Sequence, residues 1–278
     1  MQILTTPAAM RHWRLSGSGS LGFVPTMGYL HDGHLALVQR SIAENLRTVV
    51  SIFVNPLQFA PGEDFERYPR DEVRDLALLR DAGVDAVYLP SGADMYPEGF
   101  QTYAEVGAIS ERLEGEHRPG HFRGVTTIVL KLLNAVGPDR AYFGRKDAQQ
   151  LRVIQRMVRD LDLGVEIVPC DIVRERDGLA LSSRNVYLSP EERAAATVIH
   201  RALEKARSTF ELGERRAPKL RTLVQSTIAR EPLANVEYVS LADDITLEEL
   251  ETTVERPALL SVVVRFGHTR LLDNLELR

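Results

Sequence analysis

Two histidines flank an aspartate–glycine pair in the segment His31-Asp32-Gly33-His34. The segment follows a short apolar run and precedes apolar residues that recur at helical spacing, so both imidazoles fall at the N-terminus of a predicted helix. Backbone N–H groups and the helix dipole attract anions there, and glycine lets a phosphate approach the main chain. The pattern favours a phosphate-binding loop. Taken alone, it is equally compatible with a glycine-rich turn whose histidines are incidental.

A second polar segment directly follows the next apolar run, where Asn55 and Gln58 stand close together. Neutral amides both donate and accept hydrogen bonds, so they suit the hydroxyl and carboxylate groups of a small polar molecule. Taken alone, this segment is more typical of a turn capped by an asparagine side chain.

Basic side chains gather at the start of a long predicted helix, in a loop rich in glycine and proline that carries Arg118, His121 and Arg123. Such a helix start favours anion binding. A capped surface loop with solvated charges explains the same residues equally well.

A further pair of segments combines Lys146, directly after a predicted strand, with Ser182, Ser183 and Arg184 in a later loop. An ammonium, a guanidinium and two hydroxyls together can surround a triphosphate. An isolated Ser-Ser-Arg is usually a turn, but its place at a predicted domain junction favours a functional role.

Several other kinds of site are disfavoured by the sequence. It contains no Gly-x-x-x-x-Gly-Lys-Ser/Thr motif, and no Gly-x-Gly-x-x-Gly follows the first predicted strand, which disfavours P-loop enzymes and dinucleotide oxidoreductases. His31 and His34 are spaced as a metal pair, but no third ligand is evident, so zinc is disfavoured. The single cysteine, Cys170, lies in an apolar run typical of an inert core thiol and excludes an intrachain disulfide.

The elements that must position these residues alternate between strands and helices. Apolar patterns predict strands at 21–25, 48–54, 84–89, 140–143 and 165–168, and helices at 35–46, 71–82, 122–136 and 147–161. This alternation predicts an α/β fold: a Rossmann-like parallel sheet with helices on both faces. Its ligand is expected outside the carboxyl ends of the strands, where the segments after 25, 54 and 143 lie.

The pattern changes after about residue 173. Helical patterns cover 190–211 and 219–230, and strand patterns cover 235–241, 258–266 and 270–273, which predicts a smaller α+β domain. We therefore expect two domains, residues 1–174 and residues 175–278, with a hinge near 173–176 that lets the second close over the site as a lid.

Composition limits the partners. The chain has 278 residues, of which 44% are hydrophobic and 26% charged, and its net charge of −5 disfavours nucleic acid as a partner. The first residues lack the basic and apolar regions of a signal peptide, and no apolar run is long enough to span a membrane. We expect a soluble cytoplasmic protein without a membrane partner.

Five segments, in order along nearly the whole chain, resemble the pantoate–β-alanine ligase family, which is also called pantothenate synthetase. These are residues 23–34, 53–59, 118–122, 146–150 and 181–185. The family belongs to the nucleotidyltransferases with a His-x-Gly-His signature, which are relatives of class I aminoacyl-tRNA synthetases. Any one segment alone would be weak evidence, whereas all five together are specific.

The resemblance implies a ligase of pantothenate and coenzyme A biosynthesis that works in two steps. The carboxylate of (R)-pantoate attacks the α-phosphate of ATP, which gives a pantoyl adenylate and pyrophosphate. The amine of β-alanine then displaces AMP to give pantothenate. ATP with Mg²⁺ is the implied co-substrate, no tightly bound cofactor is implied, and a homodimer is expected because relatives dimerise.

The resemblance also implies roles for individual residues. His31, His34 and Lys146 would be catalytic; the family assigns His34 as proton donor, and we interpret it as a hydrogen-bond donor to the transition state. The expected pantoate and β-alanine contacts are Asn55, Gln58, Arg118, His121 and Gln150. The expected ATP-binding residues are Met27, Gly28, Tyr29, Leu30, His31, Asp32, Gly33, His34, Gly144, Arg145, Lys146, Asp147, Val173, Leu181, Ser182, Ser183 and Arg184.

Two departures from the family pattern stand out, Arg145 in place of an acidic residue and Leu57 in place of a methionine. Arg145 either strengthens ATP binding or faces solvent, and Leu57 nearly conserves volume. Asp75 lies where relatives place a carboxylate that faces a metal, but on a predicted helix a solvated side chain is the more common case, so no protein ligand for a metal is assigned.

Two other functions stay open from the sequence. One is a related nucleotidyltransferase that transfers AMP or CMP to a phosphorylated acceptor, although the two glutamines favour a hydroxy-acid carboxylate. The other is a non-catalytic nucleotide-binding or tRNA-binding module, which the net negative charge disfavours.

Overall fold

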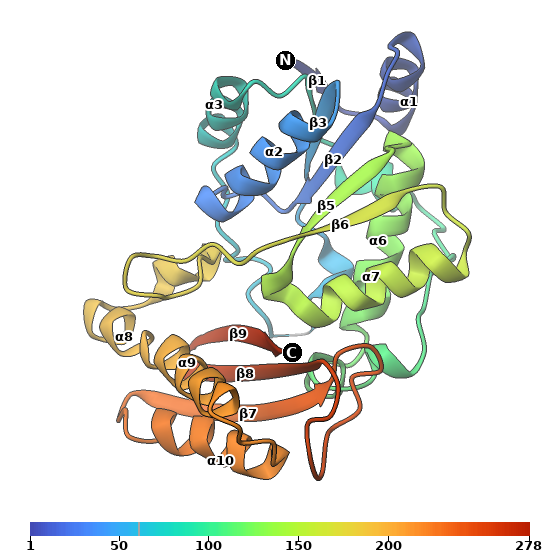
Figure 1. Ribbon diagram of the computed structural model, residues 1–278. Coiled ribbons are helices and arrows are strands. Elements are labelled where there is room, and N and C mark those ends of the chain that lie inside the picture. The colour runs from blue at the N-terminus through green and yellow to red at the C-terminus, as the bar shows by residue number, and fades with distance from the viewer. Residues whose placement is uncertain (61) are drawn as a thin grey trace. The chain divides into compact units, whose positions relative to one another are not determined.

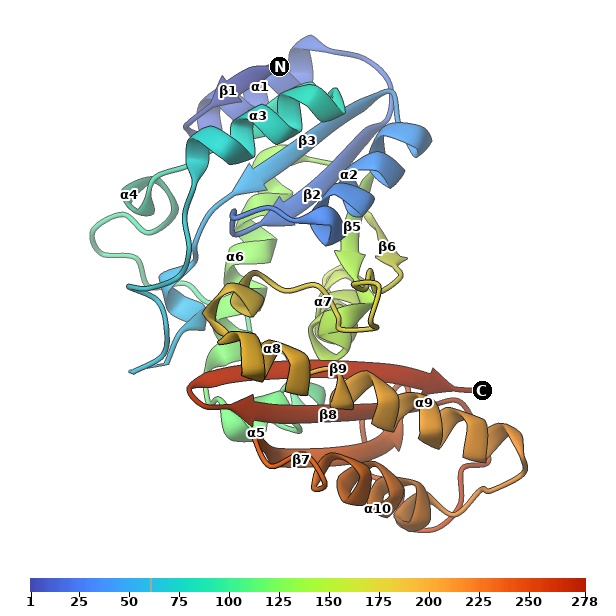
Figure 2. The ribbon, with the colours of Figure 1, turned by 90° about the vertical axis from the view of Figure 1, so that its left-hand side faces the viewer.

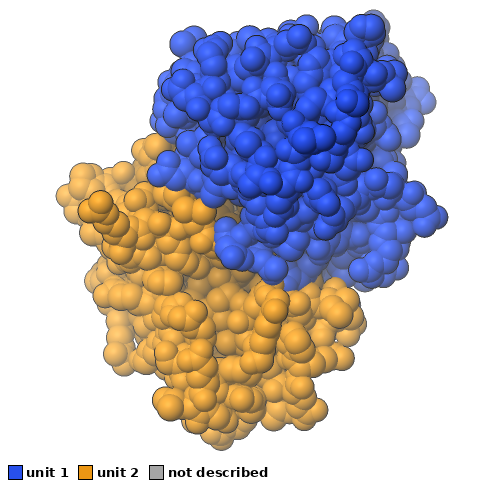
Figure 3. Space-filling model, turned by 45° about the horizontal axis from the view of Figure 1, so that its top comes forward, with its two compact units in different colours: residues 1–145, 149–171 blue, residues 146–148, 172–278 orange. Residues whose placement is uncertain are grey.

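The computed structural model describes residues 1–60 and 62–278, and these form two compact units (Figure 3). Unit 1 comprises residues 1–145 and 149–171, and unit 2 comprises residues 146–148 and 172–278. The sequence places a single boundary between residues 174 and 175. The units instead change over at 171/172, and the short segment 146–148, which no change in composition marks, belongs with unit 2.

Unit 1 is built on a parallel sheet with six strands among the described residues (Figure 1). From β2 the chain adds β3 and β4 on one side and, later, β5 and β6 on the other, so β2 and β5 flank the point where the strand order reverses. Ligands of such sheets bind at this point, beyond the carboxyl ends of the strands. In spatial order the strands are β1 (Gln2–Leu4), β4 (Ala86–Tyr88), β3 (Arg47–Ile52), β2 (Leu21–Thr26), β5 (Arg140–Gly144) and β6 (Glu166–Cys170).

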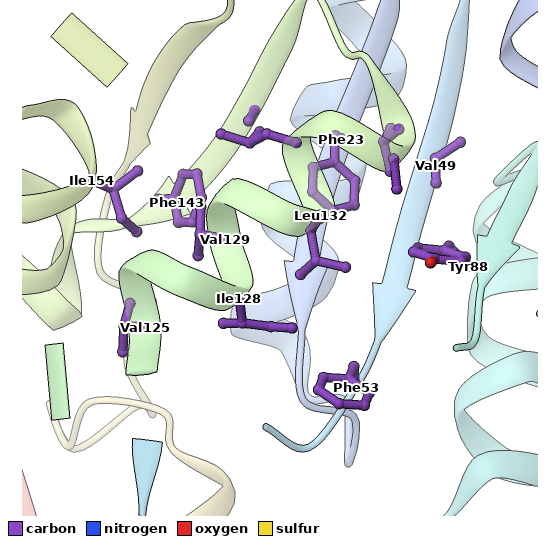
Figure 4. Close-up of a cluster of buried hydrophobic side chains, with 14 of the residues drawn as sticks. Phe23, Val49, Phe53, Tyr88, Val125, Ile128, Val129, Leu132, Phe143 and Ile154 are labelled. Carbon is purple, nitrogen blue, oxygen red and sulfur yellow. The ribbon is translucent and has the colours of Figure 1, made fainter. Parts of the chain in front are cut away.

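The strand side chains alternate between two apolar layers, because successive residues of a strand point to opposite faces. Phe23 and Val49 belong to the cluster under α1 (Pro7–Ser16), α6 (His121–Val136) and α7 (Ala148–Asp160), part of which Figure 4 shows. Val24 and Val50 pack with α2 (Asp32–Glu44) and α3 (Glu72–Ala82) instead. Helices therefore cover both faces of the sheet, as the sequence predicts.

Unit 2 has an antiparallel sheet in the order β7 (Ala234–Asp243), β8 (Ala258–Phe266) and β9 (Thr269–Leu277). Two helices, α9 (Val198–Glu211) and α10 (Ala217–Ile228), lie along one face of it (Figure 2). Ile199, Leu203, Leu260 and Phe266 form part of the apolar cluster between these helices and the sheet. The short helices η4 (Ser183–Tyr187) and α8 (Pro190–Ala195) precede α9.

The fold class predicted from the sequence is confirmed, with differences in detail. The predicted helix over 190–211 is two helices, because the chain turns at Ala196 and Thr197, where the Thr197 hydroxyl donates to the Ala194 carbonyl. β1 and α1 are not among the elements that the sequence predicts, although Thr6 caps α1 and Pro7 opens it.

The remaining elements of unit 1 among the described residues are short. They are η1 (Pro56–Gln58), α4 (Gly92–Met95), η2 (Ala108–Ser110) and α5 (Glu114–His117), and η3 (Arg145–Asp147) follows β5.

Among the residues that the structure describes, no helix combines the length and apolar character needed to cross a lipid bilayer.

Candidate active site

The histidine loop, residues 27–31, joins the end of β2 to the start of α2. Gly28 and Tyr29 both adopt left-handed backbone conformations, with φ of 81° and 50°. A Cβ atom at Gly28 would lie 3.0 Å from both Asp75 Oδ2 and Ile52 Cγ2. Glycine at this position therefore serves both the backbone conformation and the close packing.

Side chains from β2 and α3 hold the first part of this loop. The Thr26 hydroxyl donates to the Ser51 carbonyl at 2.8 Å and accepts from the N–H of Gly28 at 3.2 Å. Asp75 is buried, and its two carboxylate oxygens accept the N–H groups of Tyr29 at 2.7 Å and Leu30 at 2.8 Å. Burial raises the pKa of Asp75, although these two hydrogen bonds oppose the shift.

His31 and His34 close the loop with a reciprocal cap on α2. Nδ1 of His31 accepts the N–H of Gly33 at 3.1 Å, and Nδ1 of His34 accepts the N–H of His31 at 3.3 Å. The ring centroids lie 4.0 Å apart. Because each Nδ1 accepts a hydrogen bond, each neutral ring carries its proton on Nε2. The loop thus presents two fixed imidazole N–H donors side by side.

This geometry changes how the loop can bind an anion. From the sequence, the backbone N–H groups at the helix N-terminus are expected to donate hydrogen bonds to a phosphate. In the structure, the N–H groups of residues 28–31 and 33 donate to side chains of β2, α2, α3 and the loop itself, and that of His34 donates to the His31 carbonyl. The imidazole side chains therefore add donors for an anion to those of the backbone at this helix start.

Gln58 is oriented by its neighbours at the end of β3. Its Nε2 donates to the Met27 sulfur at 3.0 Å, and its Oε1 accepts from Asn55 Nδ2 at 3.1 Å. Asn55 is buried and also donates to the Gly124 carbonyl, while its Oδ1 accepts from the Leu57 N–H and the Tyr96 hydroxyl. Because these four bonds use the full capacity of an amide, Asn55 fixes Gln58 next to the histidine loop.

Arg118 and His121 both contact the backbone carbonyl of Gln58. Arg118 makes a two-pronged ion pair with Glu63 at 2.7 and 2.6 Å and donates to the Gln58 carbonyl at 3.2 Å. His121 Nδ1 lies 2.8 Å from that carbonyl, so it donates, and its Nε2 faces an Arg118 nitrogen at 3.2 Å. The expected basic cluster is thus balanced by a carboxylate 55 residues away in the chain.

The electrostatics of this cluster favour a neutral imidazole. Burial, and then the positive charge of Arg118, lower the pKa of His121 to about 4. Burial raises the pKa of Glu63, but the hydrogen bonds and charge of Arg118 outweigh it, and the net shift is downward. His121 therefore stays neutral and Glu63 stays ionised near neutral pH.

Three further predicted residues of unit 1 lie at the end of β5 and the start of α7. Gly144 ends β5, Arg145 lies 3.4 Å from the exposed carboxylate of Asp171, and Gln150 is partly exposed in the first turn of α7. The neighbouring Gln149 is buried and donates to the carbonyls of Ile109 and Arg112, so it holds the loop before α5.

The other predicted ATP-binding residues belong to unit 2. The Lys146 carbonyl accepts from Asn274 Nδ2 on β9 at 2.7 Å, and the Lys146 ammonium lies 3.7 Å from the Asp147 carboxylate. The N–H of Leu181 donates to the Val173 carbonyl at 3.0 Å, which brings these two predicted residues together. Ser182 caps η4, which begins with the buried Ser183 and then Arg184.

Within each unit, polar residues to which the sequence assigns no role hold several of the predicted site residues or the segments next to them. Arg174 pairs with buried Asp273 at 2.5 and 3.0 Å and also donates to the Gly178 carbonyl. Asp75 holds the histidine loop, Glu63 pairs with Arg118, and Asn274 holds the Lys146 carbonyl. No local pattern marks these residues, because their partners lie between 45 and 128 residues away.

Within the described part of the chain, no group of three or more histidine, cysteine, aspartate or glutamate side chains gathers in a way that could hold a metal ion.

The comparisons with known proteins agree with one another over the whole chain. Residues 2–276 match the model of the pantoate-beta-alanine ligase family. A pantothenate synthetase of Roseiflexus sp. (strain RS-1) is 57% identical over 277 residues, which cover 100% of this chain and 99% of the relative. That of Herpetosiphon aurantiacus is 54% identical over 279 residues, covering 99% of each.

Solved structures give the same result. The crystal structure of pantothenate synthetase from Thermus thermophilus is 49% identical, with a TM-score of 0.94 and 99% of each chain covered. A pantoate-beta-alanine ligase from Francisella tularensis, complexed with beta-gamma ATP and beta-alanine, is 33% identical, with a TM-score of 0.82 and coverage of 99% of this chain and 97% of that one. Sequence, fold and the histidine loop together show that this chain belongs to the pantoate–β-alanine ligase family.

Proposed function

We propose that this chain carries out the reaction of its family at the carboxyl ends of β2, β3 and β5, with the histidine loop as the site of adenylation. As a member of the family, the chain is an ATP-dependent carbon–nitrogen ligase that condenses (R)-pantoate with β-alanine through a pantoyl adenylate. The assignment of individual residues to the two steps is our proposal. The observation that carries it is the reciprocal cap on α2, in which Nδ1 of each histidine accepts a backbone N–H, so that the neutral rings carry their protons on Nε2.

In the first step a carboxylate oxygen of pantoate attacks the α-phosphorus of ATP, and the bond from that phosphorus to the bridging oxygen of pyrophosphate breaks. Negative charge builds on the phosphate oxygens as this happens, so fixed donors lower the barrier most. His34 and His31 donate to the α-phosphate from Nε2. No proton has to be transferred at this stage, because the leaving pyrophosphate departs as an anion.

In the second step the neutral amine of β-alanine attacks the acyl carbon of the adenylate. The new carbon–nitrogen bond forms and the bond from that carbon to the phosphate oxygen breaks. AMP leaves, and the amine nitrogen gives up a proton to solvent water. Gln58 and Gln150 bind the hydroxyl and carboxylate groups of pantoate. Asn55, Arg118 and His121 act through Gln58, whose side chain and carbonyl they hold.

Unit 2 supplies the remaining phosphate ligands in this proposal. The β- and γ-phosphates are bound by the ammonium of Lys146, by the hydroxyls of Ser182 and Ser183, and by the guanidinium of Arg184. The nucleoside is bound by the backbone around Gly28 and by Gly144, Asp147, Val173 and Leu181. Mg²⁺ enters with ATP, as part of the substrate, and keeps mostly phosphate and water ligands.

We also propose that unit 2 acts as a lid during the reaction and that the enzyme is a cytoplasmic homodimer. The support is the family relationship together with the single cysteine, which suits a reducing compartment. Sedimentation of the purified chain tests the dimer: a single species with the mass of one chain would contradict it.

The exchange of labelled pyrophosphate into ATP tests the first step. We expect exchange that requires pantoate and proceeds without β-alanine. Exchange without pantoate, or exchange supported only by a phosphorylated acceptor, would favour a different nucleotidyltransferase.

The same assay tests the histidine assignment. His34→Ala should lower the exchange rate by about two to three orders of magnitude and weaken ATP binding by less than about fivefold, because the donor matters most in the transition state. His12→Ala, which changes an exposed histidine of α1, is the matched control and should behave like the wild type. Equal losses of rate and of ATP binding would indicate a role in ground-state binding alone.

A further inference from the structure

We propose that Asp75 is a positioning residue for the histidine loop, acting through the backbone of residues 29 and 30 and not as a ligand of the metal ion that accompanies ATP. This inference rests on the proposed function, since it gives Asp75 its effect through His31 and His34. It comes from α3, a helix to which neither the sequence analysis nor the proposed mechanism assigns a substrate contact.

The first observation is how the carboxylate is used. Asp75 is 1% exposed, and each of its oxygens accepts one backbone N–H, from Tyr29 at 2.7 Å and from Leu30 at 2.8 Å. Its ion-pair partner, the Arg74 guanidinium, lies 3.8 Å away and is half-exposed. A carboxylate buried in this way has both oxygens directed at the protein backbone.

The second observation is that the loop depends on such acceptors. The N–H groups of four consecutive residues, 28–31, donate to side chains and not to backbone carbonyls of a strand or a helix. Asp75 supplies two of these four acceptors, and Thr26 and His34 supply the others. Without Asp75, two adjacent N–H groups in a buried turn would need new partners.

The third observation is backbone strain next to these bonds. Gly28 and Tyr29 are both left-handed, and tyrosine adopts this conformation at an energetic cost. Hydrogen bonds to an ionised carboxylate are stronger than those to neutral acceptors, so Asp75 can hold the chain in this shape. The shape matters because His31 follows two residues after Tyr29, and its own N–H forms half of the reciprocal cap. A change at Asp75 should therefore displace both imidazoles.

Asp75→Asn is the first test, because an amide has nearly the same shape but one oxygen and one NH₂ group. One of the two backbone N–H groups would then face another donor. We expect pantoate-dependent pyrophosphate exchange to fall about 10- to 100-fold, while the ATP dissociation constant changes by less than about threefold and the Mg²⁺ concentration for half-maximal rate stays unchanged. Asp81→Asn, at an exposed aspartate of the same helix, is the matched control and should have no effect.

A double variant separates positioning from an independent role. If Asp75 acts through His34, adding Asp75→Asn to His34→Ala should lower the rate by less than about threefold further. A multiplied loss in the double variant, or a raised Mg²⁺ requirement in Asp75→Asn, would overturn the proposal and favour a metal ligand. Failure of the proposed function gives a different result: the wild type itself would show no pantoate-dependent exchange.

Gly28→Ala covers the case in which Asp75→Asn does not fold. The added Cβ would lie 3.0 Å from Asp75 Oδ2 in a residue with φ of 81°, so it disturbs the same contact while keeping the carboxylate. Circular dichroism and thermal unfolding show which variants are folded at the assay temperature. A folded Gly28→Ala enzyme should show the same loss of rate with the same Mg²⁺ requirement, and a folded variant with the wild-type rate would contradict the proposal.

Discussion

The histidine loop of unit 1 and the loop that ends in Ser182–Arg184 in unit 2 are each held by a buried aspartate, but in opposite ways. Asp75 binds the histidine loop directly, through two backbone N–H groups. Asp273 acts through Arg174, which spans from that carboxylate to the Gly178 carbonyl at the turn before the second loop. The contacts of Asp75 fix the shape of the backbone in the histidine loop, whereas Asp273 neutralises the positive charge of Arg174.

This difference determines what each aspartate contributes. When a backbone N–H loses its acceptor, the turn can shift or admit water, so the main loss should be in the position of the imidazoles. When a partly buried guanidinium loses its buried carboxylate partner, it keeps a charge that the carboxylate no longer balances, and the folded state itself is weakened. Asp75 should therefore matter most for the rate, and Asp273 for stability.

Asp273→Asn gives the largest expected effect on stability. Arg174 would keep its charge beside a neutral amide, so the free energy of unfolding should fall by about 3 kcal/mol. Urea denaturation of the full chain measures this change, with Glu255→Gln, at an exposed residue of unit 2, as the matched control. A loss below about 1 kcal/mol would mean that the two aspartates do not differ in the way described.

The pH dependence of stability is the next largest effect, and it concerns unit 1. The pKa of His121 is lowered from 6.5 to about 4 in the folded chain. Between these values the unfolded state binds more protons, so this stabilising contribution is complete above pH 6.5 and is lost as the pH falls toward 4, by about 1.4 kcal/mol per unit. The groups that face the ring are Arg118, Glu63 and Glu114.

The measurement compares urea denaturation of the wild type and His121→Gln at pH 7 and pH 4.5. The wild type should lose about 2 kcal/mol more than the variant over this interval, because the other titrating groups are common to both. His121 belongs to unit 1, whereas Arg174 and Asp273 belong to unit 2, so this change sharpens the contrast between the units. The same loss in both proteins would mean that His121 is not held neutral.

Asn274→Ala should have a smaller effect, on ATP binding. It removes the hydrogen bond that fixes the Lys146 carbonyl, which is worth about 1 kcal/mol, or roughly fivefold in the KM for ATP. The KM for pantoate should not change, and Asn235→Ala, at an exposed position of β7, serves as the control. A loss confined to kcat would instead show that the contact acts on the chemical step.

Arg145→Ala should have the smallest effect. Its ion pair with Asp171 joins a partly exposed guanidinium to a carboxylate that is 98% exposed, and such pairs contribute little. We expect less than about a twofold change in the KM for ATP and less than about 0.5 kcal/mol in the free energy of unfolding. A tenfold rise in this KM would show that Arg145 binds the nucleotide directly.

Much of unit 1 could be predicted from the sequence because its strands and helices are continuous apolar patterns. Phe23 and Val24 point to different layers, as period-two alternation requires, and the helix over 121–136 buries a stripe at helical spacing. β1 was missed because it is a three-residue edge strand with little burial. The pattern is informative only where an element is long enough to repeat it.

The polar contacts of the site could not be predicted from the sequence in the same way. The sequence is equally compatible with an anion-binding Arg118 and with a solvated surface charge, and it does not reveal that the guanidinium forms an ion pair with Glu63 in the fold. It also suggests a solvated Asp75, whereas the carboxylate turns inward because the N–H groups of Tyr29 and Leu30 need acceptors there. In both cases the partner is distant in the chain, so no local pattern identifies it.

The hydrogen bond between Asn274 and Lys146 has a consequence for synthesis of the chain. Its two residues are 128 positions apart in the chain. A ribosome therefore makes Lys146 long before the residue that holds its backbone. The segment that carries Lys146 can reach its final arrangement only after Asn274 has been made, so a nascent chain should be able to form the sheet of unit 1 before it can hold ATP.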